Sequence, residues 1–171
     1  MAKTVDFKVL DDCHREIADH LQRLVALTER LQRRGIDPAT RAQALEIEHF
    51  FSTTSRRHHA DEESRVFPLL LASSDVDLVQ KVRMLQQDHG WIEEDWRVVS
   101  SMLRAIGEGL VGDMQEELPA VIEIFADLLR EHVALEESLI YPEARAAAQT
   151  LERRRAARSA ASVTAAAPSS S

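Results

Sequence analysis

The sequence has little of several features on which other classes of protein depend. Its 171 residues include one cysteine, five glycines, five prolines and only 5% aromatic residues. A single cysteine excludes an internal disulfide framework, a zinc ribbon and an all-cysteine iron–sulfur site. So few glycines and prolines are not typical of a turn-rich β fold. No apolar run approaches the roughly 20 residues that span a bilayer, and the N-terminus lacks the apolar core of a signal peptide. We therefore expect no membrane partner and a cytoplasmic location.

Charge is distributed unevenly along the chain. The net charge of −8 disfavours nucleic acid as the main partner. Residues 152–171 hold four arginines and one glutamate, so they carry +3 and leave −11 for residues 1–151. The last dozen residues are mostly Ala, Ser and Thr, with no large apolar side chain, which predicts disorder. We therefore expect a folded domain over residues 1–151 and a basic, then Ala/Ser-rich disordered tail over 152–171.

The remaining composition and its periodicity predict helices. Leu, Ala, Glu, Arg and Gln are abundant, which is typical of long helices. Apolar residues recur at alternating steps of three and four, the pattern of a bundle seam. The four seams run from Leu10 to Leu31, from Ala44 to Leu69, from Val82 to Ile106 and from Ile122 to Leu139. Short connections between them predict an all-α protein, an antiparallel up-down-up-down four-helix bundle.

Glycine and proline mark the predicted ends of the helices. Gly35 is a natural stop for the first helix, and the second starts after Asp37-Pro38. We expect Pro68 to bend or end the second helix and Pro142 to interrupt the fourth. A further helical piece, the C-terminal extension, is expected to reach about Arg155 before the disordered tail.

The histidines carry the functional information. Four of the seven lie on the seams, one per helix: His14, His58, His89 and His132. The other three, His20, His49 and His59, fall off the seams. Buried histidines need a hydrogen-bond partner or a metal, and bundles build metal sites from inward side chains on facing helices. Glu62 and Glu136 each follow a seam histidine by four residues, so each shares a helix face with it.

An internal repeat supports this selection. The segments HHADEESRVFP (58–68) and HVALEESLIYP (132–142) match with an offset of 74 residues, and the two lone histidines are offset by 75. The chain therefore reads as two helix hairpins, each with one lone histidine and one HxxxE pair. The register favours His14 over His20 and His58 over His59. The candidate metal ligands are His14, His58, Glu62, His89, His132 and Glu136.

The candidate ligands suit a metal that can react with small oxidants. Four imidazoles and two carboxylates suit iron, manganese or zinc. Six side chains on two metals leave open coordination positions, where O₂, peroxide, nitric oxide or water would bind. A redox-active pair of iron ions is the leading hypothesis. A closed structural zinc site would more usually have four ligands that include several cysteines.

The pattern H…HxxxE…H…HxxxE, with EExxx[F/Y]P after two of the histidines, resembles the hemerythrin-like (HHE cation-binding) family over about residues 7–150. The resemblance implies a four-helix bundle around a non-haem di-iron centre, with Glu62 and Glu136 bridging the ions. It implies binding of O₂ or a related small oxidant, in O₂ or iron sensing or handling, or in protection against oxidative or nitrosative stress. An enzyme that breaks down peroxide or nitric oxide is the alternative.

The chain departs from the O₂-carrying members of that family at two positions. Those proteins have a fifth histidine one turn after the third-helix histidine, where this chain has Glu93. They also place the last carboxylate five residues after the final histidine, which would make it Glu137 rather than Glu136. Glu93 could ligate or face solvent. Fewer nitrogen ligands favour redox reactivity over reversible O₂ carriage.

Two other functions compete with this interpretation. A ferritin-like carboxylate site needs two Glu-x-x-His motifs, and the chain has one such spacing, Glu46 to His49, with no second one on the fourth helix. A metal-free interaction module would leave four buried histidines without partners. It predicts that leucine at a seam histidine stabilises the protein.

Four further side chains have expected places near the seams. We expect Cys13 to be a small packed side chain, and Trp91, Trp96 and Tyr141 to pack near the site. Tyr141 is either a core residue or a hydrogen-bond partner of the site.

Overall fold

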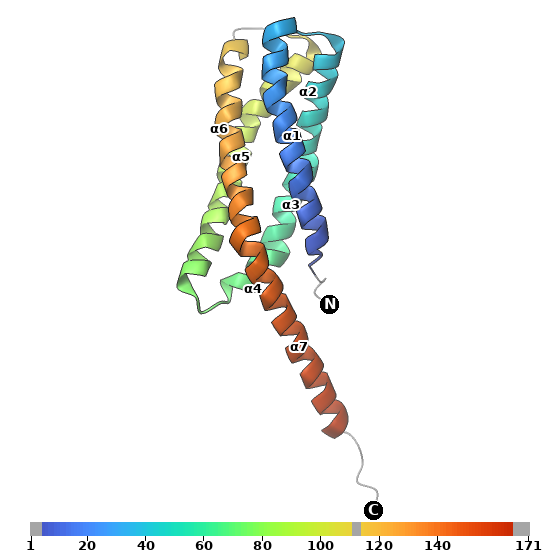
Figure 1. Ribbon diagram of the computed structural model, residues 1–171, viewed down its shortest axis with the longest axis vertical. Coiled ribbons are helices and arrows are strands. Elements are labelled where there is room, and N and C mark those ends of the chain that lie inside the picture. The colour runs from blue at the N-terminus through green and yellow to red at the C-terminus, as the bar shows by residue number, and fades with distance from the viewer. Residues whose placement is uncertain (1–4, 111–113, 166–171) are drawn as a thin grey trace, which may run out of the picture.

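Four long helical segments lie side by side and form one bundle (Figure 1). The computed structural model describes residues 5–110 and 114–165. Helices account for most of both ranges and no strand occurs in them, which confirms the predicted all-α bundle. In chain order the helices are α1 (Phe7–Arg34), α2 (Pro38–Phe50), α3 (Arg56–Asp61), α4 (Phe67–Leu71), α5 (Val76–Glu108), α6 (Met114–Leu135) and α7 (Tyr141–Ala165), with π-helical turns at η1 (Phe51–Ser55), η2 (Glu62–Val66) and η3 (Glu136–Ile140).

Short polar residues and glycines set the ends of the helices. Asp37 caps α2 by accepting from Thr40 N at 2.6 Å, and Asp75 caps α5 by accepting from Leu78 N at 3.1 Å. These contacts satisfy backbone N–H groups that have no partner within the helix. Gly35 and Gly109 follow α1 and α5 with φ values of 65° and 81°, a region that favours glycine. The predicted end of the first helix at Gly35 and the predicted start of the second at Asp37-Pro38 are confirmed.

The bundle contains two hydrophobic clusters, one toward each end. α1 and α5 each contact both α2 and α6, so apolar side chains from four directions meet between them. In α5 the small cluster includes Leu85 and the large cluster includes Ile92. On the fourth segment the large cluster includes Leu129 and the small one includes Ile140. The residues between these positions, including His89 and His132, therefore lie between two apolar blocks.

Pro68 and Pro142 stand inside helical segments that continue past them. Pro68 does not end its segment, which runs on to Leu71, and Pro142 does not interrupt the fourth, which runs on to Ala165. Each proline comes just after a π-helical turn, η2 or η3. Proline lacks an N–H and clashes with the carbonyl four residues earlier in an α-helix. The wider i→i+5 turn relieves that conflict.

The same two π-turns shift which side chains are buried. The seam pattern predicted Leu69 and Leu139 in the core, but both are only partly buried. Leu70 and Ile140 are buried instead, at 2% and 0% exposure. A π-turn takes up one extra residue, so the buried face moves on by one position in both segments.

The last helix extends past the bundle. α7 projects beyond the other helices (Figure 1) and continues to Ala165, well past the predicted end near Arg155. The structure thus differs from the disorder expected after about Arg155, since the helix includes residues 156–165, and this alanine-rich stretch has a high helix propensity. Residues 166–171 lie outside the described residues, and the division into a domain and a tail stays a prediction.

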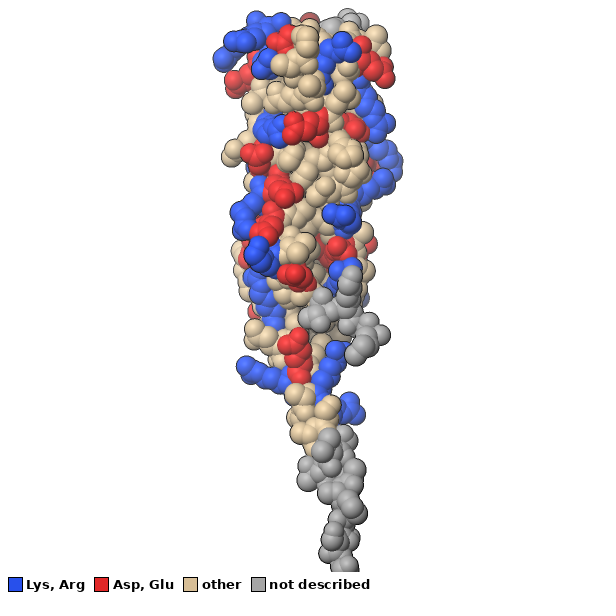
Figure 2. Space-filling view, turned by 90° about the vertical axis from the view of Figure 1, so that its right-hand side faces the viewer, with Lys and Arg blue, Asp and Glu red and all other residues tan. Residues whose placement is uncertain are grey.

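Charged side chains of both signs are spread over the face of the molecule that Figure 2 shows. Figure 2 shows acidic and basic side chains interspersed over one face of the bundle, and basic ones near the projecting helix. Among the described residues, no helix is both long enough and apolar enough to cross a membrane.

Candidate metal centre

The six candidate ligands come together inside the bundle, between the two hydrophobic clusters. None is more than 5% exposed. They come from all four segments: His14 from α1, His58 and Glu62 from α3 and η2, His89 from α5, and His132 and Glu136 from α6 and η3. The seam positions therefore bring these side chains to one place.

A seventh side chain, His59, joins this cluster although the sequence analysis set it aside. His59 is 6% exposed. Its ring stacks on His89 with centroids 4.3 Å apart and lies 5.6 Å from the His132 ring. Neighbouring helix positions point about 100° apart, so His58 and His59 reach two different parts of the cluster. The repeat hid this residue, because its equivalent in the second segment is Val133.

The buried donors form two groups that share Glu62. The nitrogen-rich group is His59, Glu62, His89 and His132, and the oxygen-rich group is His14, His58, Glu62 and Glu136. Within each group the potential ligand atoms all lie within 4.8 Å of one another. Each group alone has enough donors to hold one metal ion.

The two buried carboxylates each turn one oxygen toward each group. Glu62 Oε1 lies 3.4 Å from His58 Nε2, and its Oε2 lies 3.6 Å from His89 Nε2. Glu136 Oε1 lies 3.2 Å from His132 Nε2, and its Oε2 lies 3.3 Å from His14 Nε2. Carboxylates placed in this way suit a bridge between two ions.

The donor atoms fit a metal better than they fit one another. Seven buried nitrogen and oxygen atoms of His58, His59, Glu62, His132 and Glu136 make no hydrogen bond with proper geometry to any residue that the structure describes. Buried polar atoms without partners are costly. His89 Nε2 and His132 Nε2 lie 3.1 Å apart, close to the roughly 3 Å between two nitrogens that bind one ion at right angles at about 2.1 Å.

Burial and mutual contacts separate the pKa values of the two carboxylates. Burial raises the pKa of Glu136 to about 8, and the nearby charge of Glu62 adds to this effect. Burial also acts to raise the pKa of Glu62, but its contacts with His89 and other histidines outweigh burial and lower it. Burial lowers the pKa values of His58 and His132 to about 4. Neutral imidazoles and at least one ionised carboxylate are the forms that bind metals.

Three carboxylates lie around the outer side of the cluster. Glu137 Oε1 lies 3.1 Å from His14 Nδ1, and Glu63 Oε1 lies 2.8 Å from His89 Nδ1. Asp88 Oδ2 lies 3.7 Å from His132 Nδ1. Glu137, left open as a ligand by the sequence, thus contacts the outer nitrogen of a histidine and belongs to neither donor group.

Tyr141 fulfils both roles that the sequence left open. It is 1% exposed, and its hydroxyl donates a hydrogen bond to Glu62 Oε1. The hydroxyl oxygen of Tyr141 lies 3.1 Å from His14 Nε2, and the rings of Tyr141 and His14 stack with centroids 5.0 Å apart. Tyr141 therefore places one O–H group at the edge of the oxygen-rich group.

The other aromatic residues and the cysteine divide into core and surface. Trp96 is buried and donates from Nε1 to Ser52 Oγ at 3.0 Å. The expectation that Trp91 packs near the site is wrong, because its side chain is 61% exposed. Cys13 is buried as expected, and burial raises the pKa of its thiol to about 12, which makes it a weak nucleophile.

Several other candidate residues lie away from the cluster. Glu93, which the sequence left open, pairs with Arg56 at 3.1 Å and belongs to neither donor group. Glu46 pairs with Arg23 at 2.6 Å on the surface, and His49 is exposed. The one Glu-x-x-His spacing therefore points away from the bundle core, which removes the basis for a ferritin-like site.

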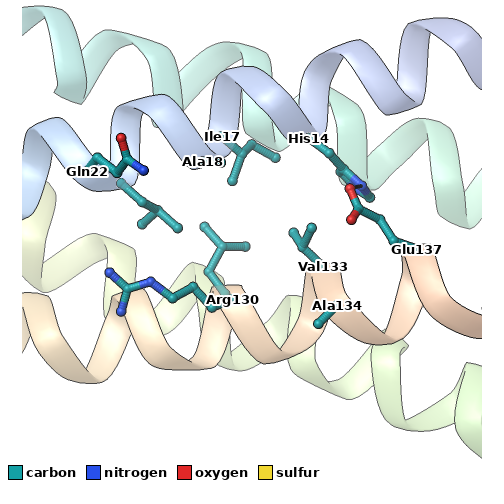
Figure 3. A pocket seen from close by; sticks show the side chains of 10 residues that line it. His14, Ile17, Ala18, Gln22, Arg130, Val133, Ala134 and Glu137 are labelled. Atoms are coloured by element: carbon teal, nitrogen blue, oxygen red, sulfur yellow. Dashed lines mark hydrogen bonds and ion pairs between the residues drawn. The ribbon is translucent and has the colours of Figure 1, made fainter.

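A cavity of about 240 Å³ lies between α1 and α6 and reaches the cluster (Figure 3). Its walls are mainly apolar, with Ile17 and Val133 among them. His14 and Glu137 lie at one end, and Gln22 and Arg130 lie toward the other (Figure 3). A small uncharged molecule could approach the donors by this route.

A helical bundle with a buried cluster of histidines and carboxylates between its helices is the architecture of a metal-binding protein. The model of the hemerythrin HHE cation-binding domain matches residues 5–144. The chain belongs to this family. An uncharacterized protein of Haemophilus influenzae is 26% identical over 133 residues, which cover 77% of this chain and 74% of that protein. No solved structure matches the chain.

Proposed function

We propose that this chain is a non-haem di-iron protein that binds O₂ or a related small oxidant. The observation that carries the proposal is the pair of donor groups joined by two carboxylates, each with one oxygen toward each group. His14 and His58 would be terminal ligands of one ion, and His59, His89 and His132 of the other. Glu62 and Glu136 would bridge the two.

The chain's own residues suit the chemistry of small oxidants. Iron, when bound, supplies the capacity to exchange electrons with O₂ or peroxide. The apolar clusters on both sides of the site exclude bulk water, and this strengthens electrostatic interactions inside it. The cavity between α1 and α6 offers an approach for a small neutral molecule. Binding for sensing, handling or protection would all use this arrangement.

A second function, breakdown of peroxide, is favoured by one specific side chain. Tyr141 holds a proton on its hydroxyl oxygen next to Glu62 and His14. General acid catalysis needs a proton within hydrogen-bond reach of the reacting group. Tyr141 is placed to supply such a proton at the oxygen-rich group, and its neighbour Glu62 is placed to orient it.

The first test is the metal content of the full chain. Untagged protein, purified without chelators and loaded anaerobically with ferrous iron, is analysed by plasma mass spectrometry. We expect about two irons per chain, and much less in the double variant His58→Ala/His132→Ala. The double variant His20→Ala/His49→Ala, which removes two histidines outside both groups, should keep the wild-type content.

Two outcomes would contradict the proposal. Unchanged iron in His58→Ala/His132→Ala would overturn the ligand assignment. No metal in wild-type protein after ferrous loading would favour a metal-free interaction module, for which leucine at a seam histidine should stabilise the fold. If iron binds, reversible O₂ binding and peroxide turnover, measured on the same sample, separate the first function from the second.

A further inference from the structure

The second glutamate of each HxxxEE segment crosses to the other half of the chain. Glu63 follows Glu62 in sequence, but its carboxylate meets His89 Nδ1 at 2.8 Å. Glu137 follows Glu136, and its carboxylate meets His14 Nδ1 at 3.1 Å. The two contacts are equivalent under the repeat, and each joins one hairpin to the lone histidine of the other.

In both histidines the opposite ring nitrogen faces the donor groups. His89 Nε2 lies 3.1 Å from His132 Nε2, and His14 Nε2 lies 3.3 Å from Glu136 Oε2. An ionised carboxylate can only accept a hydrogen bond, so Nδ1 must carry the proton that it shares with Glu63 or Glu137. In a neutral imidazole this leaves the lone pair on Nε2, directed into the cluster.

We propose that Glu63 and Glu137 are positioning residues that fix the tautomer and ring orientation of His89 and His14. This inference rests on the proposed metal centre and deepens it. A carboxylate on the outer nitrogen of a metal-binding histidine raises the basicity of the inner nitrogen and holds the ring. Glu63 acts through His89 on the nitrogen-rich group, and Glu137 acts through His14 on the oxygen-rich group.

The lone histidines are the ones that need this support. The carboxylate four residues after His58 or His132 belongs to a donor group, whereas His14 is followed at that spacing by Ala18, and Glu93, four residues after His89, belongs to neither group. The side chains of Glu63 and Glu137 are 46% and 55% exposed. They can therefore be replaced without opening a cavity in the core.

The tautomers can be read directly by NMR. Long-range ¹H–¹⁵N spectra of imidazole-labelled, chelator-treated full chain at pH 9, where an ordinary imidazole is neutral, distinguish Nδ1–H from Nε2–H. We expect Nδ1–H at His14 and His89, the opposite of the form that free histidine prefers. Glu137→Ala should release His14 alone, and Glu63→Ala should release His89 alone. Glutamine at either position should keep the tautomer, because its carbonyl still accepts.

Zinc affinity tests whether the positioning matters for metal binding. Stepwise titration of the same proteins with Zn²⁺ against a competing chelator gives the affinity of each site. Removing an outer partner of this kind typically weakens metal binding by about 10–100-fold. We expect a loss of this size for one site in Glu63→Ala and for the other in Glu137→Ala. Glu131→Ala, at an exposed position next to His132, is the matched control and should not weaken either site.

The outcomes separate this inference from the function on which it rests. Nε2–H at both lone histidines in the wild type overturns the positioning role. Unchanged zinc affinity in both alanine variants also overturns it, as does weaker zinc binding with both tautomers intact. Nδ1–H tautomers that depend on Glu63 and Glu137, in a protein that binds zinc but shows no iron-dependent O₂ or peroxide chemistry, support the positioning role and contradict the proposed function.

Discussion

The two halves of the molecule, residues 7–71 and 76–145, share a backbone plan but differ in chemistry. Each half has a lone histidine, an HxxxEE segment, a π-turn that begins at the first glutamate of that pair, and a proline just after the turn. The shared plan explains why buried donors arrive from both sides at the same level of the bundle. It does not make the two donor groups alike.

Two substitutions between the halves account for most of the asymmetry. His59 in the first half corresponds to Val133 in the second, so the first half contributes an extra imidazole. Phe67 stacks on His89 with centroids 5.5 Å apart, whereas its equivalent Tyr141 places a hydroxyl on Glu62. One group therefore has three nitrogens and one carboxylate, and the other has two of each with a phenol beside it.

This difference shows that a sequence repeat can place two side chains at equivalent positions without giving them the same chemical properties. Glu62 and Glu136 occupy equivalent places, yet the pKa of one is lowered and that of the other is raised. Groups with such divergent environments suit divided roles in acid–base chemistry. The following experiments test whether the two groups are as distinct as their donors indicate.

The largest effect is expected from Glu62, the one donor that belongs to both groups. Replacing it with alanine should remove metal from both sites, so iron content should fall from about two per chain toward zero. Plasma mass spectrometry on ferrous-loaded protein measures this. The control is Glu93→Ala, which removes a carboxylate that pairs with Arg56 and lies outside both groups. This variant should retain its iron.

Full iron content in Glu62→Ala would contradict the prediction that Glu62 bridges the two ions. In that case the two groups would be independent sites. Circular dichroism of each variant establishes that lost iron reflects a lost ligand and not a lost fold.

The next effect should be confined to one group. His59→Leu gives the first half an apolar side chain, as the second half has at Val133, and should lower iron content to about one per chain. The same change removes a buried nitrogen that has no hydrogen-bond partner among the described residues. In chelator-treated protein it should therefore stabilise the fold by about 1–3 kcal/mol, measured by urea unfolding.

If His59→Leu lowers the iron content but raises the stability of the metal-free protein, the role of His59 is metal binding and not packing. His49→Leu, on the exposed face of α2, is the matched control and should change stability by no more than about 0.5 kcal/mol. A destabilised His59→Leu protein with unchanged iron would assign His59 a packing role.

Much of the fold and most of the donors were predictable from sequence, because both depend on periodicity. Seam positions repeat every three or four residues, and burial of an apolar stripe leaves little choice about which face turns inward. His14 and His89 could be selected for that reason alone. The glycine and aspartate signals at the helix ends are equally local, so Gly35 and Asp37 marked their boundaries correctly.

The misses near the two prolines share one physical cause, which is the π-turn. A helix with one extra residue in a turn no longer follows the periodicity from which the seam was read. Leu70 and Ile140 were missed, and Pro142 was misjudged as a break, because nothing in a 3.6-residue pattern predicts η2 or η3. His59 was missed for another reason: the repeat selects what the halves share, and His59 is a difference. The contacts of Glu63 and Glu137 cross between halves, so no local pattern contains them.

A smaller effect should distinguish the two carboxylates by pH. The pKa of Glu136 in the folded protein is about 8, above its ordinary value of 4.5. The folded state thus keeps a proton that the unfolded chain releases, and this contribution to stability is lost as pH rises from about 4.5 to 8. Glutamine has no proton to release in this range, so Glu136→Gln does not lose stability in this way as pH rises. The Tm of the chelator-treated variant, relative to wild type, should rise across this window by several degrees.

Glu62→Gln is the matched comparison, because the pKa of Glu62 is lowered. The ionised Glu62 carboxylate stabilises the fold above about pH 4.5, and this stabilisation is lost only as pH falls below that value. The Tm difference between Glu62→Gln and wild type should therefore rise less between pH 5 and 8 than that of Glu136→Gln, and only through the part of the Glu136 shift that the charge of Glu62 supplies. The same slope in both variants would mean that the two carboxylates share one environment.

The smallest effect concerns the phenol that distinguishes the halves. Tyr141→Phe makes the second half resemble the first at Phe67 and removes the hydrogen bond to Glu62. Loss of a bond to a charged group should cost about 1.5–3 kcal/mol of unfolding free energy, measured by urea unfolding without metal. Ring stacking on His14 does not need the hydroxyl, so iron content should remain.

Peroxide consumption by the iron-loaded Tyr141→Phe protein then tests what the hydroxyl does besides stabilise. If its proton serves the reaction, the rate should fall by more than the change in iron content explains, in keeping with the 10²–10⁴-fold typical of general acid catalysis. Phe67→Tyr, the reverse exchange in the other half, should not restore that rate in the double variant, because Phe67 stacks on His89 on the nitrogen-rich side. Restoration would mean that the two groups are interchangeable, and the asymmetry between the halves would then have no chemical role.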